Sequence, residues 1–95
     1  MPHKDKEEAR LYKKLKRHWN REFVKRVKKL LCCVDCGEKD YIVLEFDHVR
    51  GEKVGSIANM AASYSISSLK KEMRKCEVRC ANCHRRRHFR EKNSK

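Results

Sequence analysis

Long apolar runs are absent from this sequence, and hydrophobic residues make up only 39% of its 95 residues. No run approaches the roughly 18 apolar residues that a membrane span requires, and the start lacks the apolar segment of a secretory leader. We therefore expect a cytoplasmic protein without a membrane partner. A chain this short and this polar cannot bury a large core, so a metal or a disulfide framework is expected to stabilise it.

Acidic residues are scarce relative to basic ones. The sequence has 13 Asp and Glu against 26 Lys and Arg, which gives a formal charge of +13, with the basic excess concentrated at both ends of the chain. A positive field of this size on a small protein favours a polyanionic partner, with nucleic acid ahead of an anionic membrane. The alternative is a soluble, highly charged surface without such a partner.

Cysteine, in contrast, is abundant, since the chain has six. In a reducing compartment Cys-x2-Cys pairs are more often metal ligands than disulfides, and two such pairs from distant parts of a chain supply the tetrahedral set that zinc prefers. The alternative is a set of buried thiols or a redox pair. We predict a structural zinc site made by Cys33, Cys36, Cys80 and Cys83.

Two cysteines remain outside this set. Cys32 could replace Cys33 as a ligand, but the Cys-x2-Cys-Gly form fits a zinc knuckle better, because Gly37 provides the permissive backbone of the turn. Cys76 is expected to be a small buried apolar side chain.

One helix is predicted from residue 9 to residue 31, after a disordered or frayed start over residues 1–8. Its apolar residues recur at steps of three and four and trace one stripe that would cover the core: Tyr12, Leu15, Trp19, Phe23, Val27 and Leu30. Basic residues occupy the other faces. They are either solvated or in contact with phosphates, and we favour phosphate contact through Lys13, Lys16, Arg17 and Lys25. His3 and His18 are expected to be surface residues.

The remaining elements are short. Residues 41–46 are rich in β-branched and aromatic side chains and predict a strand. Two short helices are expected, one capped by Ser56 and running to about Ala62, and one after Ser65 that ends near Lys75 and turns Ile66, Leu69 and Met73 inward. Residues 76–79 predict a second strand that pairs with the first, and a final helix should begin near Ala81. In the first strand the predicted faces are Ile42, Leu44 and Phe46 on one side, and Val43, Glu45 and Asp47 on the other.

A second cluster of possible ligands lies at the end of the first strand and on the last helix. His84 and His88 are four residues apart, so on a helix they project from the same face and can grip one ion. Asp47 can bring a hard oxygen to the same point. A metal ion bound by one carboxylate and two imidazoles keeps coordination positions open for water and substrate, which is typical of a hydrolytic metal site. The alternative is that these histidines are solvated members of a basic helix.

These motifs, CVDCG, LEFDHVRGEK and KCEVRCANCHRRRH, resemble those of the HNH endonucleases with the ββα-metal fold, including the endonuclease VII-like members of phages and bacteria. The resemblance covers roughly residues 32–90. It implies that Asp47, His84 and His88 bind a catalytic metal ion and that His48 is the general base. Lys75 stands where many members have the family's middle Asn, which holds the loop that carries the base, so Asn59 and Asn82 are the candidates for that role.

The resemblance implies an α+β fold with a basic helical extension over residues 1–31, a nuclease domain over 32–92 and a short tail over 93–95. The expected activity is hydrolysis of DNA phosphodiester bonds with Mg²⁺ or Mn²⁺, by a homodimer or within a larger phage or host DNA-processing complex. Neighbouring phosphates would be neutralised by Arg85, Arg86, Arg87 and Arg90. The alternatives are a non-catalytic, zinc-stapled nucleic-acid-binding module and an accessory subunit of a phage DNA-packaging machine.

Overall fold

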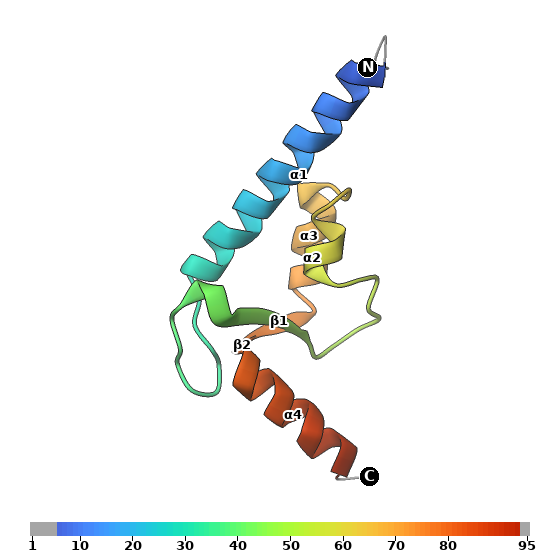
Figure 1. The fold of residues 1–95 in the computed structure, drawn as a ribbon. Helices are drawn as coiled ribbons and strands as arrows, with labels where there is room; N and C mark the ends of the chain where they lie inside the picture. The colour runs from blue at the N-terminus through green and yellow to red at the C-terminus, as the bar shows by residue number, and fades with distance from the viewer. Residues whose placement is uncertain (1–5, 94–95) are drawn as a thin grey trace.

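The computed structural model describes residues 6–93. His3 and residues 94–95 of the predicted tail lie outside the described residues. A pair of short antiparallel strands lies near the centre, with two short helices on one side and the C-terminal helix on the other (Figure 1). The chain is thus a small α+β protein, as predicted. In chain order the elements are α1 (Lys6–Lys29), η1 (Tyr41–Val43), β1 (Leu44–His48), α2 (Ile57–Met60), α3 (Ile66–Met73), β2 (Cys76–Cys80) and α4 (Ala81–Asn93).

The two strands pair with Leu44 opposite Cys80 and His48 opposite Cys76. This confirms the predicted pairing, and β2 extends one residue beyond the predicted 76–79. Because α4 follows β2 without a linker, the helix begins beside the end of the sheet. The sheet therefore brings both strands and the first turn of α4 into one small region.

The predicted start of the first strand is wrong. Residues 41–43 form a 3-10 turn, in which the Asp40 carboxylate accepts a hydrogen bond from the backbone N–H of Ile42 at 3.1 Å. A short Asp side chain that bonds to the backbone in this way offers the chain an alternative to a strand ladder. The opposite strand also ends at Cys80, so residues 41–43 have no strand to pair with. As a result Ile42 is 75% exposed instead of sharing the buried face of β1.

The core is small and consists of two clusters that meet at Phe46, as the low apolar content of the sequence requires. The first lies between the sheet and the cysteine turns and contains Cys33, Leu44, Val78, Cys80 and Cys83. The second lies between α2, α3 and the end of α1 and is centred on Ile57, Met60 and Leu69.

The short helices begin where they were predicted. The Ser56 hydroxyl accepts from the backbone N–H of Asn59 at 3.1 Å, and the Ser65 hydroxyl accepts from that of Ser68 at 3.1 Å. These caps satisfy donors that the first helical turn leaves unpaired. Of the predicted inward residues of α3, Leu69 is fully buried and packs in the second core cluster.

The apolar stripe of α1 covers the core only in part, which corrects the sequence expectation. Phe23 is half-buried and packs on the second cluster, but Trp19 is 60% exposed and Leu30 is 85% exposed. Figure 1 shows that the N-terminal half of α1 extends beyond α2 and α3. No helix among residues 6–93 is both long and apolar enough to cross a membrane.

A polar residue anchors α1 to the rest of the chain. Asn20 is only 2% exposed, and its amide donates to the backbone oxygens of Ala61 at 3.1 Å and Tyr64 at 2.7 Å. The helix face that turns inward is therefore centred on Asn20 and Val24 rather than on the predicted stripe, and the stripe rotates toward solvent.

Candidate functional site

The four predicted zinc ligands come together. Their sulfur atoms, in Cys33, Cys36, Cys80 and Cys83, all lie within 4.8 Å of one another. Cys32 is exposed and is not part of this group, so Cys33 rather than Cys32 lies in the cluster. The first pair is shaped by a tight turn, in which the backbone N–H of Gly37 donates to the oxygen of Cys33 at 2.9 Å. Gly37 has φ +80°, a conformation that glycine adopts without strain.

The donor set fits zinc. Sulfur atoms bound to zinc at about 2.3 Å in a tetrahedron stand roughly 3.8 Å apart, and the sulfurs of Cys36 and Cys80 are separated by 3.7 Å. Burial by itself would raise the pKa of the Cys33 thiol, but backbone hydrogen bonds to its sulfur, the largest from Cys80, lower the pKa to about 6. In the same cluster the hydrogen bond with Cys80 raises the pKa of Cys83 to about 12. Because the thiolate is the form that binds metal, all four sulfurs become thiolates only when a cation binds them. These four cysteines can therefore hold a metal ion such as zinc.

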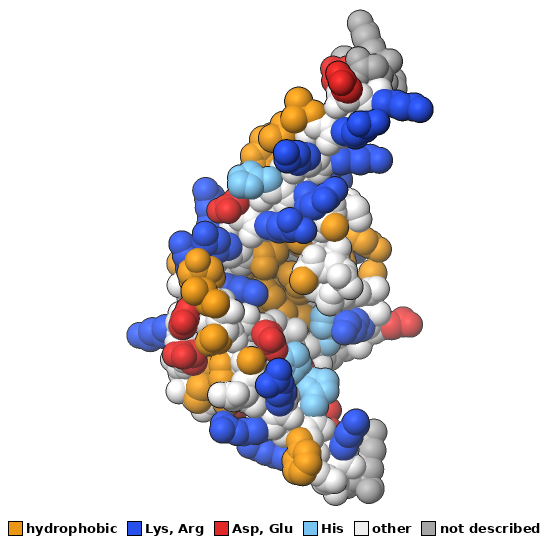
Figure 2. All heavy atoms as spheres, viewed as in Figure 1, with side chains coloured by type: hydrophobic (Ala, Val, Ile, Leu, Met, Phe, Trp, Pro, Cys, Tyr) orange, Lys and Arg blue, Asp and Glu red, His pale blue; other side chains and the backbone are white. Residues whose placement is uncertain are grey.

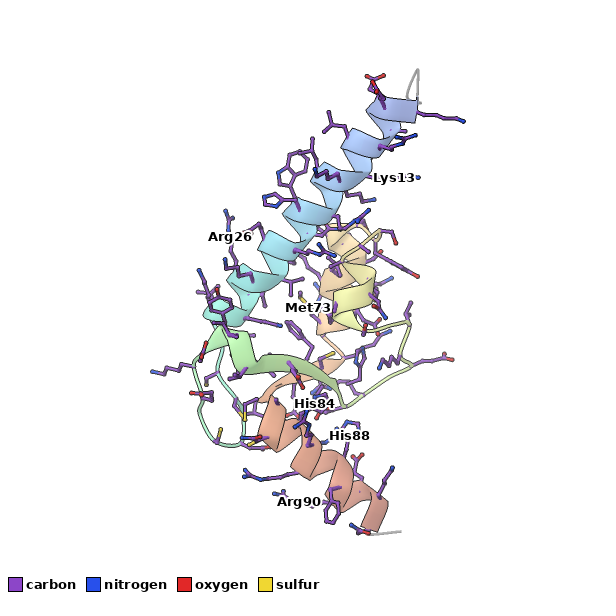
Figure 3. All side chains as sticks on the ribbon, viewed as in Figure 1. Lys13, Arg26, Met73, His84, His88 and Arg90 are labelled. Atoms are coloured by element: carbon purple, nitrogen blue, oxygen red, sulfur yellow. The ribbon has the colours of Figure 1, made fainter. Side chains whose placement is uncertain are left out.

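The second predicted cluster also forms, on the opposite side of the sheet from α3. Nε2 of His84 lies 3.3 Å from Oδ1 of Asp47, and Nε2 of His88 lies 3.5 Å from the same oxygen. The two Nε2 atoms are 3.1 Å apart. Figure 3 shows both histidines on the first turns of α4, at the end of the helix nearest the strands. One oxygen and two nitrogen atoms thus converge on one point, as a divalent cation requires.

The outer contacts of this cluster orient its ligand atoms. Oε1 of Glu45 lies 2.7 Å from Nδ1 of His84. When Nδ1 donates to this carboxylate, Nε2 keeps its lone pair directed toward Asp47, which is how carboxylates orient metal-binding histidines. Glu45 and Asp47 lie on the same face of β1, as the alternation of the strand predicted.

Asp47 is only 1% exposed and is held by two guanidinium groups. Nη1 of Arg79 donates to Oδ2 at 3.0 Å, and Nη1 of Arg87 donates to Oδ1 at 2.9 Å. A buried carboxylate needs such partners, because an unpaired charge in the interior is costly. Arg87 was predicted to contact phosphate, but its guanidinium is bound to Asp47 and to Glu91, at 2.7 Å from the latter.

His48, the predicted base, points to the opposite face of β1 from Asp47. Its Nε2 lies 2.8 Å from Oε2 of Glu72 in α3, and the side chain is 14% exposed. Glu72 is 2% exposed. Burial alone would raise the pKa of Glu72, but hydrogen bonds from Lys75, the Val54 backbone and His48 lower it to about 2. The structure therefore pairs the predicted base with a buried, ionised carboxylate.

Neither candidate for the middle Asn reaches this histidine. Asn59 and Asn82 are both exposed, and within residues 6–93 the hydrogen-bond partner of the His48 ring is Glu72. Glu72 also accepts a hydrogen bond from the backbone N–H of Val54 at 3.0 Å, in the loop that follows β1. The carboxylate thus holds both the ring and the loop, a role that the resemblance assigned to an amide side chain.

The predicted phosphate contacts lie in two separate regions. In α1, Lys13 and Arg17 are exposed, Lys16 is half-buried, and Lys25 is half-buried with its ammonium 5.5 Å from the centre of the Tyr41 ring. In α4 the exposed residues of the set are Arg85, Arg86 and Arg90. Figure 2 shows Lys and Arg side chains along α1 and again over α4, with histidine side chains between the two regions.

The sequence interpretation missed three residues of the site: Glu72, Glu45 and Arg79. For Glu72 a signal was present, because it lies three residues after Leu69, on the face of α3 that was expected to be apolar. A charged residue at such a position is seldom buried without a partner. Glu45 was predicted to share a face with Asp47, but its partner His84 comes from another part of the chain, and Arg79 carries no local signal.

No family model matched the chain, and the searches of curated proteins and of solved structures gave no significant match. What the site can do must therefore be inferred from its own donor atoms, charges and hydrogen bonds.

Proposed function

We propose that the chain is an HNH-type endonuclease, which hydrolyses phosphodiester bonds in DNA with a divalent cation and a histidine base. The observation that carries the proposal is that the ligand atoms of Asp47, His84 and His88 all lie within 4.8 Å of one another. His48 follows Asp47 directly in the chain. Two antiparallel strands followed directly by a helix with two of the ligands is also the arrangement expected of a ββα-metal site. A structural site alone would need only the four cysteines.

In this proposal Asp47, His84 and His88 hold the cation. A Mg²⁺ or Mn²⁺ ion bound there would polarise the phosphate and stabilise the leaving oxygen. His48 would take a proton from the water that attacks phosphorus, as the general base. The cysteine cluster holds a structural zinc ion, which anchors the start of α4 to the turn before β1.

The proposed partner is DNA. The exposed arginines of α4 lie on the same helix as the two histidine ligands, and we propose that they neutralise DNA phosphates near the site. The basic side chains of α1 would contact the backbone further along the duplex. Contacts of this kind position DNA without reading its bases, so we expect weak sequence preference in the isolated chain. Assembly as a homodimer, or within a phage or host complex, would decide whether one strand or both are cut.

Plasmid nicking with added Mg²⁺ or Mn²⁺ tests the proposal. His48→Ala should lower the nicking rate by roughly 10²- to 10⁴-fold, the range expected for loss of a general base, while Mn²⁺ binding measured by calorimetry is unchanged. His88→Ala should weaken Mn²⁺ binding, and excess Mn²⁺ should partly restore its activity. His88 is the preferred ligand variant because it is 58% exposed, so its removal leaves no cavity.

His18→Ala is the matched control, because His18 is an exposed histidine of α1 that belongs to neither cluster. It should nick at the wild-type rate. DNA binding without nicking at any metal concentration would instead favour a non-catalytic binding module. Nicking that appears only with a partner protein would favour an accessory subunit. Restoration of His48→Ala by added metal would show that His48 is not the base.

A further inference from the structure

We propose that Glu72 is a positioning residue that fixes which nitrogen of His48 accepts the proton, namely Nδ1. This inference rests on the proposed function, in which His48 is the base. It concerns a residue of α3 that lies 24 positions from His48 and that no motif of the sequence singles out.

The hydrogen bonds around Glu72 determine the tautomer of His48. An ionised carboxylate can only accept hydrogen bonds, so the 2.8 Å contact between Oε2 and Nε2 of His48 requires that Nε2 carries the proton. In the neutral ring the proton acceptor is then Nδ1. Two further donors hold the carboxylate in the ionised form, the ammonium of Lys75 at 2.9 Å from Oε1 and the backbone N–H of Val54 at 3.0 Å from Oε2.

The same contacts hold the loop that follows the base. Lys75 Nζ donates to the backbone oxygen of Glu52 at 2.7 Å, and the backbone oxygen of Lys75 accepts from Val49 N at 2.9 Å. The ring of His48 is therefore held by the Glu72 carboxylate, and that carboxylate is itself held by hydrogen bonds from Lys75 and from the Val54 backbone. A base held in this way loses little freedom when the substrate arrives, which is the advantage of a supporting hydrogen bond behind a catalytic group.

A simpler interpretation is that Glu72 and Lys75 form a buried ion pair that only stabilises the fold. The two interpretations can be separated by variants that remove the ion pair with or without the hydrogen-bond acceptor for His48. Lys75→Met removes the ion pair but leaves the acceptor for His48, whereas Glu72→Leu removes both. Glu72→Gln keeps an acceptor, because the His48 ring and the Val54 N–H both point at the Oε2 position and would hold the amide oxygen there.

The experiment measures the tautomer and the activity of these variants in the full-length, zinc-loaded protein. The ¹⁵N chemical shifts of the His48 ring, recorded at a pH where the ring is neutral, report which nitrogen is protonated. Wild type, Lys75→Met and Glu72→Gln should show protonated Nε2, and their plasmid nicking rates should lie within about 5-fold of one another. Glu72→Leu should lose this tautomer preference, and its nicking rate should fall roughly 10- to 100-fold, a part of the contribution of a general base.

Zinc content and far-UV circular dichroism establish that each variant is folded. If Glu72→Leu does not fold, the tautomers of wild type and Glu72→Gln still decide, because a His48 ring protonated on Nδ1 in either protein would overturn the role of Glu72. Protonated Nδ1 in wild type, or loss of activity in Lys75→Met equal to that in Glu72→Leu, would overturn the role of Glu72. Absence of nicking by wild type with any divalent ion would overturn the proposed function itself, whatever the tautomer.

Discussion

Replacement of Arg79 by methionine is expected to destabilise the protein strongly. Arg79 is 8% exposed, and its guanidinium joins three carboxylates. Its Nε lies 2.8 Å from Asp35 in the cysteine turn, its Nη1 lies 3.0 Å from Asp47, and its Nη2 lies 3.0 Å from Glu77. The Arg79 side chain therefore links the turn of the cysteine cluster to Asp47, the buried carboxylate of the proposed catalytic cluster.

The magnitude follows from the burial of the three partners. Asp35 and Glu77 have side chains that are 43% and 36% exposed, so each pair contributes at most about 1 kcal/mol. The Asp47 side chain is 1% exposed, and removal of one partner from a buried ion pair costs about 3–5 kcal/mol. Because Asp47 keeps Arg87, the lower end of this range applies. We expect a loss of about 3 kcal/mol in the free energy of unfolding.

Thermal unfolding at a fixed zinc concentration, followed by far-UV circular dichroism, measures this loss. For a domain of this size 1 kcal/mol shifts the Tm by roughly 4–8 °C, so Arg79→Met should lower the Tm by about 12–24 °C. Arg85→Met is the control, since Arg85 is an exposed arginine of α4, and its Tm should change by no more than about 4 °C. Equal Tm values for Arg79→Met and Arg85→Met would refute the reasoning.

Three further predictions follow from the clusters and from α1. Chelation of zinc, or Cys36→Ser, should abolish most of the far-UV helical signal, because zinc binding to such a site contributes about 10 kcal/mol or more; an intact signal would contradict this. Between pH 8 and 5 the difference in urea unfolding between wild type and Glu72→Gln should stay constant, because the pKa of Glu72, which burial raises but hydrogen bonds lower more, is about 2 when folded and 4.5 when exposed, so the carboxylate is ionised in both states. Its stabilisation is lost only as pH falls below 4.5, where protonation of the cysteines would also release zinc, so a difference that shrinks between pH 8 and 5 would refute the assignment. Exchange of the four α1 residues proposed to contact DNA for Gln should reduce the slope of log K against log salt by up to about 3.6, and an unchanged slope would assign them to solubility.

The sequence alone predicted the features that depend on local spacing. The two Cys-x2-Cys pairs, the helical interval between His84 and His88, and the caps Ser56 and Ser65 all appear in the structure as expected. Each depends on the geometry of a few consecutive residues, which periodicity and turn chemistry determine. The pairing of the two strands was predictable for a related reason, since each is short and apolar on one side.

Tertiary structure alone decided which charged residues support the clusters and which apolar residues are buried. The partners of the key contacts are far apart in the chain: 24 residues for His48 and Glu72, 39 for Glu45 and His84, and 44 for Arg79 and Asp35. Such contacts depend on strand register and helix packing, which no local pattern specifies. The same holds for α1, where the apolar stripe predicted an inward face, but the anchor at Asn20 and the limited length of the neighbouring helices left much of the stripe in solvent.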